Sequence, residues 1–218
     1  MAFVLGLDQV YQSTLLSSIP WVSHGFGTAQ ASPVHGTVHA SLRQTHSDQV
    51  RFIEHPGEKQ DDGDALITQT NGLWISIRTA DCLPILLIDP LNRAVAAIHT
   101  GWRGTAARIV QLAVDGMSQR FGSDPVSLLA AIGPGIDYCC FEVGDDVTCH
   151  FEAFTTTGSQ GKAHVNLKAA NLHLLLDSGL PQANVDVSPH CTVSSSGFHS
   201  FRRDRTEGRM VSAVQISC

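Results

Sequence analysis

The chain has 218 residues, with 14 Lys and Arg against 20 Asp and Glu, so its formal net charge is −6. This acidic balance argues against a protein that binds nucleic acid or another polyanion. With 43% apolar and 16% charged residues the composition is globular, and the length suits one domain over residues 1–218 with a substantial core. We expect this domain to fold without needing a disulfide or a metal ion.

The first twenty residues contain no Lys or Arg and therefore lack the basic-then-apolar layout of a signal peptide. No apolar run approaches the roughly 18 to 20 residues that a membrane helix needs. We therefore expect a cytoplasmic protein with no membrane partner, in which the cysteines are reduced. The six cysteines are Cys82, Cys139, Cys140, Cys149, Cys191 and Cys218.

Strands and helices alternate irregularly along the chain. Apolar runs predict strands over residues 65–68, 73–79, 85–88, 94–99, 127–132, 184–187 and 210–216. Apolar periodicity and end signals predict helices over residues 105–121, 145–154 and 167–178. Residues 27–41 and 155–163 have the composition of loops. This pattern predicts an α+β fold, a single domain of mixed, largely antiparallel β-sheet flanked by helices.

Two of the predicted strands form a hairpin around Asp89-Pro-Leu-Asn92, because so short a connection permits only antiparallel pairing. If the turn is centred between Pro90 and Leu91, the numbers of paired residues sum to 181, which places Cys82 opposite His99. Directly opposed residues have Cβ atoms about 5 Å apart. Cys82 and His99 would then be close enough to share a metal ion or a proton.

Cys82 and His99 admit more than one function. A catalytic zinc ion takes three protein ligands, and the third would be His46 or His24, which the residues alone do not rank. Without a metal, Cys82 and His99 would be a nucleophile and its base, with Asp81 or another acid orienting the histidine. A buried thiol beside a hydrogen-bonded histidine is the structural alternative.

Cations and glycines near this pair suit an anionic ligand. Gly101 and Gly104 bracket Trp102 and Arg103 just before a predicted helix, so backbone N–H groups and a cation lie together. A later basic cluster either pairs with Asp204 and Glu207 or clamps an anion; it comprises Arg202, Arg203 and Arg205. The turn at 133–135 has no Lys and no Walker spacing, which argues against nucleoside triphosphate hydrolysis.

The remaining histidines and cysteines are expected to be structural or to face solvent. His190 and His199 stand out slightly because they flank Cys191 and the arginine cluster. Core packing is the favoured interpretation for Cys139 and Cys140. The histidines without a predicted role are His35, His39, His55, His150, His164 and His173.

Motifs along most of the chain, from His24 onward, resemble the multicopper polyphenol oxidase (laccase-like) family, which is also described as a family of purine nucleoside phosphorylases. They are Gln44-Thr-His46, Gly63-Asp-Ala65, Thr79-Ala-Asp-Cys-Leu-Pro84, His99-Thr-Gly-Trp-Arg-Gly104, Ile132-Gly-Pro134, Cys140-Phe-Glu-Val143, Ser200-Phe-Arg-Arg203 and Gly208-Arg209. One Cys and two His are too small a set for a multicopper oxidase.

The resemblance implies one zinc ion bound by His46, Cys82 and His99, with copper as the alternative ion. It also implies phosphorolysis of adenosine, inosine and methylthioadenosine, with adenosine deamination as a further activity, so the partners would be a purine nucleoside and phosphate. Arg103 and Arg203 would neutralise the anionic substrate, and Asp81 or Glu142 would handle protons. The alternatives are a Cys–His thiol hydrolase or amidase, polyphenol oxidation with copper, and a zinc ion that only stabilises the fold.

One segment departs from the family pattern. Ala29 stands where family members usually carry Arg, and only about fifteen residues separate it from Gln44, where members usually have a longer insertion. We expect the metal site to be retained and the wall of the substrate pocket to differ.

Overall fold

Two six-stranded sheets lie face to face in the computed structural model, which describes residues 2–34, 39–55, 61–158 and 161–217. The first sheet contains, in spatial order, β1 (Phe3–Leu5), β2 (Tyr11–Ser13), β3 (Val22–Phe26), β15 (Met210–Ile216), β7 (Trp74–Thr79) and β4 (His39–Ala40). The second contains β14 (Val185–Val187), β10 (Leu129–Ile132), β8 (Leu83–Asp89), β9 (Ala94–Thr100), β6 (Ala65–Thr68) and β5 (Val50–Phe52). A small third sheet has the order β11 (Glu142–Val143), β13 (Ala163–Val165) and β12 (Thr155–Thr157).

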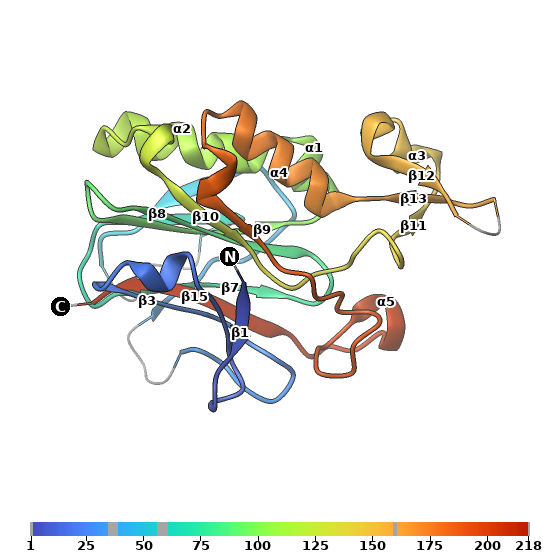
Figure 1. Cartoon of the computed structure of the whole chain (residues 1–218), viewed down its shortest axis with the longest axis horizontal. Helices are drawn as coiled ribbons and strands as arrows, with labels where there is room; N and C mark the ends of the chain where they lie inside the picture. Colours follow the sequence, from blue (N-terminus) through green and yellow to red (C-terminus); the bar gives the residue numbers. More distant parts are fainter. Residues whose placement is uncertain (1, 35–38, 56–60, 159–160, 218) are drawn as a thin grey trace.

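Helices cover the outer face of the second sheet, giving three layers in all (Figure 1). The covering helices are α1 (Trp102–Ala106), α2 (Ile109–Phe121) and α4 (Leu167–Asp177), while α3 (Asp145–Thr148) lies beside the small sheet and α5 (Phe201–Asp204) precedes β15. Short 3₁₀ turns are η1 (Leu16–Ser18), η2 (Pro125–Ser127), η3 (Glu152–Phe154) and η4 (Gln182–Asn184). Pairing within both large sheets is mixed and mostly antiparallel, which confirms the predicted α+β fold. Within the described ranges, no helix has the length and apolarity to cross a bilayer.

Strands β8 and β9 form the centre of the molecule because all seven residues of each are buried. Leu86 and Ala97 face the core between the two sheets, whereas Ile85 and Ile98 face the core under the helices. A strand covered on both faces has a continuous apolar sequence rather than an alternating one. This explains why these two runs are so evident in the sequence.

The β8–β9 register differs from the predicted one by two residues. Pro84 lies opposite His99, so paired numbers sum to 183, and the predicted pairing of Cys82 with His99 is wrong. The turn is shifted along the chain because the Asp89 carboxylate accepts the N–H groups of Leu91 and Asn92, at 2.9 and 3.0 Å. A slip of two residues keeps each side chain on its face, and so Cys82 and His99 still project to the same side of the sheet.

The predicted helix over 105–121 is two helices, because Arg108 adopts a left-handed φ of 61° between α1 and α2. The one predicted over 145–154 is reduced to α3 and η3. The helix predicted over 167–178 is confirmed as α4, whose first turn is capped by the Asn166 side chain accepting the N–H of Ala169 at 2.9 Å.

The two predicted loops contain strands. Residues 155–163 carry β12 and the beginning of β13, and residues 27–41 include β4. These strands are only two or three residues long, too short for an alternating pattern to identify them. Residues 35–38, with His35, and Cys218 lie outside the described residues.

His24 lies on β3 and is almost fully buried, with 4% of its surface exposed. Its Nε2 accepts the backbone N–H of Ser13 at 3.0 Å. Burial disfavours the charged ring and lowers the pKa of His24 to about 4, although the Ser13 backbone opposes this. His24 is therefore a neutral acceptor that joins β3 to β2.

We expect His24 to make the fold sensitive to acid. Below pH 6.5 the unfolded chain protonates this ring, whereas the folded chain does not until about pH 4. The free energy of unfolding therefore decreases as the pH is lowered from 6.5 to about 4. The full loss is about 3 kcal/mol, from 1.36 kcal/mol per pKa unit. Urea unfolding of the wild type and His24→Gln between pH 7.5 and 4.5 measures it. The variant should lose less stability on acidification, and parallel curves would contradict the assignment.

Candidate metal centre and its cavity

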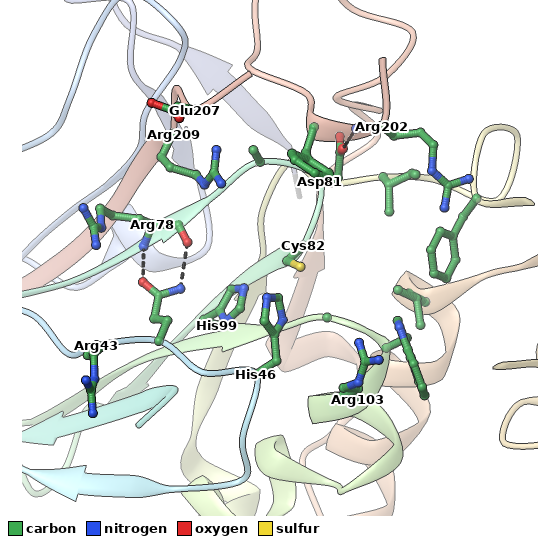
Figure 2. A pocket seen from close by; sticks show the side chains of 18 residues that line it. Arg43, His46, Arg78, Asp81, Cys82, His99, Arg103, Arg202, Glu207 and Arg209 are labelled. Carbon is green, nitrogen blue, oxygen red and sulfur yellow. Dashed lines mark hydrogen bonds between the residues drawn. The ribbon is translucent and has the colours of Figure 1, made fainter. Parts of the chain in front are cut away.

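Three side chains from separate segments converge at one end of the central strands of the second sheet. His46 follows β4, Cys82 directly precedes β8, and His99 is the second-to-last residue of β9. Their ligand atoms all lie within 4.8 Å of one another, and the three side chains point toward a common centre (Figure 2). His24 does not belong to this group. A thiol and two imidazoles in this arrangement can hold a metal ion.

Asp64, which directly precedes β6, organises both histidines. Its buried carboxylate lies 2.7 Å from His99 Nδ1 and accepts the backbone N–H groups of Thr45, His46 and Ser47 at 3.2, 3.1 and 2.6 Å. His46 itself has a left-handed φ of 58°, a conformation that these hydrogen bonds support. The contact with Nδ1 leaves Nε2 of His99 available to a ligand, an outer-shell arrangement common around metals.

The pKa values in this cluster are strongly shifted. Burial favours the neutral thiol of Cys82, but hydrogen bonds with His46 and His99 outweigh burial and lower its pKa to about 6. Burial likewise opposes the charge on His99, but Asp64 and Cys82 raise its pKa to about 9. Burial would raise the pKa of Asp64, yet His99 and Ser47 hold it well below its usual range. The hydrogen bonds in this cluster therefore favour the thiolate form of Cys82 and the protonated form of His99.

Gly101 leaves the space that the cluster needs. A Cβ atom at this position would lie 2.8 Å from Cys82 Sγ and 3.4 Å from His46 Nδ1. The backbone at Gly101, with φ −90° and ψ −170°, is open to any residue. The requirement for glycine is therefore steric and concerns the cluster rather than the turn.

The cluster lies in a cavity of about 610 Å³. The apolar part of the wall includes Trp102, Ile136, Phe141, Leu167 and Phe201. Among the described residues, five arginines line the same cavity: Arg43, Arg78, Arg103, Arg202 and Arg209. Arg103 and Arg202 lie on one side of the cluster, and the other three lie on the opposite side (Figure 2). Such a cavity can accept an anion next to an apolar ring.

Two of these arginines are held by aromatic side chains. The Arg103 guanidinium lies over the Trp102 ring at 4.2 Å, and that of Arg202 lies 5.5 Å from the centre of the Phe141 ring. Gln44 fixes the opposite wall through two hydrogen bonds of 2.8 Å with the backbone of Arg78 (Figure 2). Stacking uses the face of a guanidinium and not its N–H donors. Arg202 also donates one N–H to the Glu142 carbonyl at 2.8 Å, so its other N–H groups are the ones that can meet an anion.

Arg203 and Glu142, two residues expected near substrate, do not line the cavity. The Arg203 guanidinium donates to the carbonyls of Thr192, Val193, Ser195 and Phe198 and to the carboxylate of Asp204. Arg203 therefore fixes the chain before α5, and its neighbour Arg202 faces the cavity. Glu142 pairs with Lys162 at 2.8 Å.

Asp81 lines the cavity but does not orient His99, a contact made by Asp64 instead. One oxygen of Asp81 accepts the Thr192 hydroxyl and the other accepts the backbone N–H of Arg202, both at 2.7 Å. Through these two hydrogen bonds, Asp81 connects the turn that contains Cys82 with the beginning of α5.

Asp64 is the functional residue that sequence reasoning missed. Its position next to β6, a strand that pairs with β9, was the available signal, but it requires knowing the pairing. The expectation of core packing is wrong for Cys139, which is exposed, but half-buried Cys140 does pack against the core under the helices. Both residues lie in a turn rather than in a strand or helix.

The fold and this cluster define a protein with a candidate metal centre in an arginine-rich cavity. Residues 28–217 match the family described as "Multi-copper polyphenol oxidoreductase laccase", and the chain belongs to this family. "Adenosine deaminase RL5" of an unknown prokaryotic organism is 39% identical over 179 residues, which are 74% of this chain and 68% of that protein. "Purine nucleoside phosphorylase" of Deinococcus radiodurans is 39% identical over 182 residues, covering 81% of this chain and 70% of the relative.

Solved structures share the whole fold. The hypothetical protein YfiH of Bacillus licheniformis superposes with a TM-score of 0.89 at 26% sequence identity, over 98% of both chains. YlmD of Geobacillus stearothermophilus has a TM-score of 0.90 at 24% identity over 99% of both chains. The similarity in fold therefore extends well beyond the candidate centre.

We expect Asp64→Asn to weaken both the fold and metal binding. Removing one partner from a buried charged contact costs about 3–5 kcal/mol, and losing an outer partner of a ligand costs about 10- to 100-fold in metal affinity. Urea unfolding and competition with a zinc chelator measure the two effects. Asp48→Asn, an exposed change in the same segment, is the control. Unchanged values for Asp64→Asn would contradict the organising role.

Gly101→Ala should damage the centre while leaving the fold intact. The added methyl crowds Cys82 Sγ, and overpacking of 1–3 kcal/mol corresponds to a loss of about 10- to 100-fold in metal affinity. Gly197→Ala is the control, because its Cβ would meet only Ser195 Oγ, at 3.8 Å. Equal zinc affinities for the two variants would show that the space at Gly101 is not needed.

Proposed function

We propose that this chain is a zinc-dependent purine nucleoside phosphorylase. It would cleave adenosine, inosine and methylthioadenosine with inorganic phosphate, and deaminate adenosine as a further activity. The observation that carries the proposal is the convergence of His46, Cys82 and His99 in a cavity that has both apolar walls and arginines. The names of the two relatives, a purine nucleoside phosphorylase and an adenosine deaminase, support it.

The donor set fits a catalytic zinc ion. Catalytic zinc sites commonly have three protein ligands and one open position, and His46, Cys82 and His99 supply one thiolate and two imidazoles. Asp64 presents Nε2 of His99, and the absent side chain of Gly101 keeps the space beside Cys82. When bound, such an ion supplies Lewis-acid polarisation of an oxygen atom. Copper is the competing ion, because it binds nitrogen and sulfur ligands more tightly than zinc.

Different parts of the cavity wall would bind the purine ring and the phosphate. Phe141 and Leu167 offer apolar surface for a purine ring, and Arg103 and Arg202 lie on the same side of the centre as candidate phosphate ligands. A guanidinium pairs with phosphate through two parallel hydrogen bonds. In a chain of net charge −6, such local clustering of cations is what makes phosphate binding favourable.

In the proposed reaction, a phosphate oxygen attacks C1′ of the ribose and the bond from C1′ to the purine nitrogen breaks. The purine then takes up a proton, and the products are the free base and ribose 1-phosphate. Asp81 and Glu207 are acidic residues of the cavity wall. Because both oxygens of Asp81 already accept hydrogen bonds, we assign Asp81 to positioning and Glu207 to the proton.

A second candidate is a thiol hydrolase or amidase. Cys82, His99 and Asp64 lie in the order nucleophile, base and orienting acid, and the lowered pKa of Cys82 suits a nucleophile. This activity would need no metal ion. Dependence on zinc therefore distinguishes the two candidates.

We expect adenine and ribose 1-phosphate to form from adenosine only when phosphate is added. Metal-depleted protein should be inactive and recover with zinc, and Cys82→Ser should be inactive. Arg103→Ala should raise the KM for phosphate by about 10- to 100-fold, since a hydrogen bond to a charged group contributes about 1.5–3 kcal/mol. Arg120→Ala is the control, because Arg120 pairs with Glu54 on the surface.

Chromatography of adenine, ribose 1-phosphate and inosine gives the result. The absence of all three from zinc-loaded protein contradicts the proposal. Hydrolysis that survives chelation and stops on alkylation of Cys82 favours the thiol enzyme. Unfolding on chelation, with no turnover before it, favours a zinc ion that serves only the fold.

A further inference from the structure

A second group of three sulfur atoms lies outside the cavity. Cys139 and Cys140 are in the turn before β11, and Cys191 follows β14. All three Sγ atoms lie within 4.8 Å of one another, and those of Cys139 and Cys140 are 3.4 Å apart. None of the three residues lines the cavity of the His46–Cys82–His99 centre.

Backbone contacts hold the two segments together independently of the thiols. Residues Gly135 and Cys191 form a parallel β-bridge, and the Asp137 N–H donates to Cys191 Sγ at 3.4 Å. The Lys168 ammonium donates to the Asp137 carboxylate and to the carbonyls of Ser188 and His190, at 2.8 to 2.9 Å. The buried Lys168 thus joins both segments to α4, so the sulfur atoms are brought together before any ligand binds.

The spacing of the sulfur atoms suits a shared ion. A metal–sulfur bond of about 2.3 Å places three sulfurs around one ion about 4 Å apart. The separations in the cluster, from 3.4 Å to at most 4.8 Å, include this value. Exposure decreases from Cys139 through Cys140 to Cys191, so an ion has access from solvent on one side and a buried ligand on the other.

The ligand set favours a soft ion. Within the described part of the chain, no fourth His, Cys, Asp or Glu joins the group. The nearby Asp137 carboxylate is already bound by Lys168 and by the N–H of Tyr138. Structural zinc normally takes four ligands, whereas sites made only of thiolates suit soft ions such as Cu(I).

We propose that Cys139, Cys140 and Cys191 form a second metal site that binds one Cu(I) ion through three sulfur atoms. The thiols release their protons to solvent as the ion binds, and the ion enters and stays as Cu(I), so no oxidant is involved. The site is distinct from the proposed zinc centre in its ligands and in its position.

The test is an anaerobic titration of reduced protein with Cu(I) against a coloured Cu(I) chelator. Cys82→Ser serves as the parent, because this change removes the sulfur of the other centre. The parent should take up one Cu(I) per chain. Adding Cys139→Ser or Cys191→Ser removes a direct ligand of the ion. Loss of an outer partner of a ligand costs about 10- to 100-fold in metal affinity, and we expect these two changes to cost more than that. Adding Cys149→Ser, an exposed cysteine outside the cluster, should change nothing.

X-ray absorption of the loaded parent should report three sulfur ligands. Equal Cu(I) affinity in all the variants, or nitrogen and oxygen neighbours around the ion, would overturn the proposal. Uptake of zinc but not Cu(I) through these cysteines would overturn the choice of ion. Circular dichroism verifies the fold of Cys191→Ser, and the exposed Cys139→Ser keeps the test decisive if the buried change unfolds the chain.

Discussion

The Asp64 carboxylate is the contact on which the centre depends. It is fully buried, and it accepts hydrogen bonds from three consecutive backbone N–H groups, from the Ser47 hydroxyl and from His99. A loop with a left-handed residue is thereby fixed to the end of a central strand, and two histidines that are far apart in the chain reach one point. These donors stabilise the buried carboxylate without a Lys or Arg partner. His99 contacts Asp64 through Nδ1 only, and its other ring nitrogen can therefore face Cys82.

The β8–β9 hairpin gives this contact a rigid support. Both strands are buried on both faces, and Cys82 and His99 lie at the same end of the pair. Helix α1 begins two residues after Thr100, so Trp102 and Arg103 enter the cavity from the same strand. The cavity is built on two strands whose residues are all buried, and the side chains that these strands carry therefore have little freedom to move.

The sequence predicted what depends on local pattern and missed what depends on pairing. The apolar runs that became β6 to β9 identified the central strands, and Cys82 and His99 came together despite a register that was wrong by two residues, since such a slip conserves the face. Asp64 could not be recognised because its partners lie at 45–47 and at 99. Arg202 and Arg203 differ by one position on a short helix, and only the structure shows which of them faces the cavity.

Hydrogen bonds at α5 connect one wall of the cavity to the turn that carries Cys82. Asp81 binds the N–H of Arg202, and Arg203 binds the carbonyls of residues 192–198, so this wall is continuous with the turn that carries Cys82. An outward displacement of α5 would break both contacts and move the turn that carries Cys82. The opposite wall carries the exposed side chains of Arg43, Arg78 and Arg209, of which Arg43 is paired with Asp62. Arg78 and Arg209 therefore present positive charge to an anion on this side of the cavity.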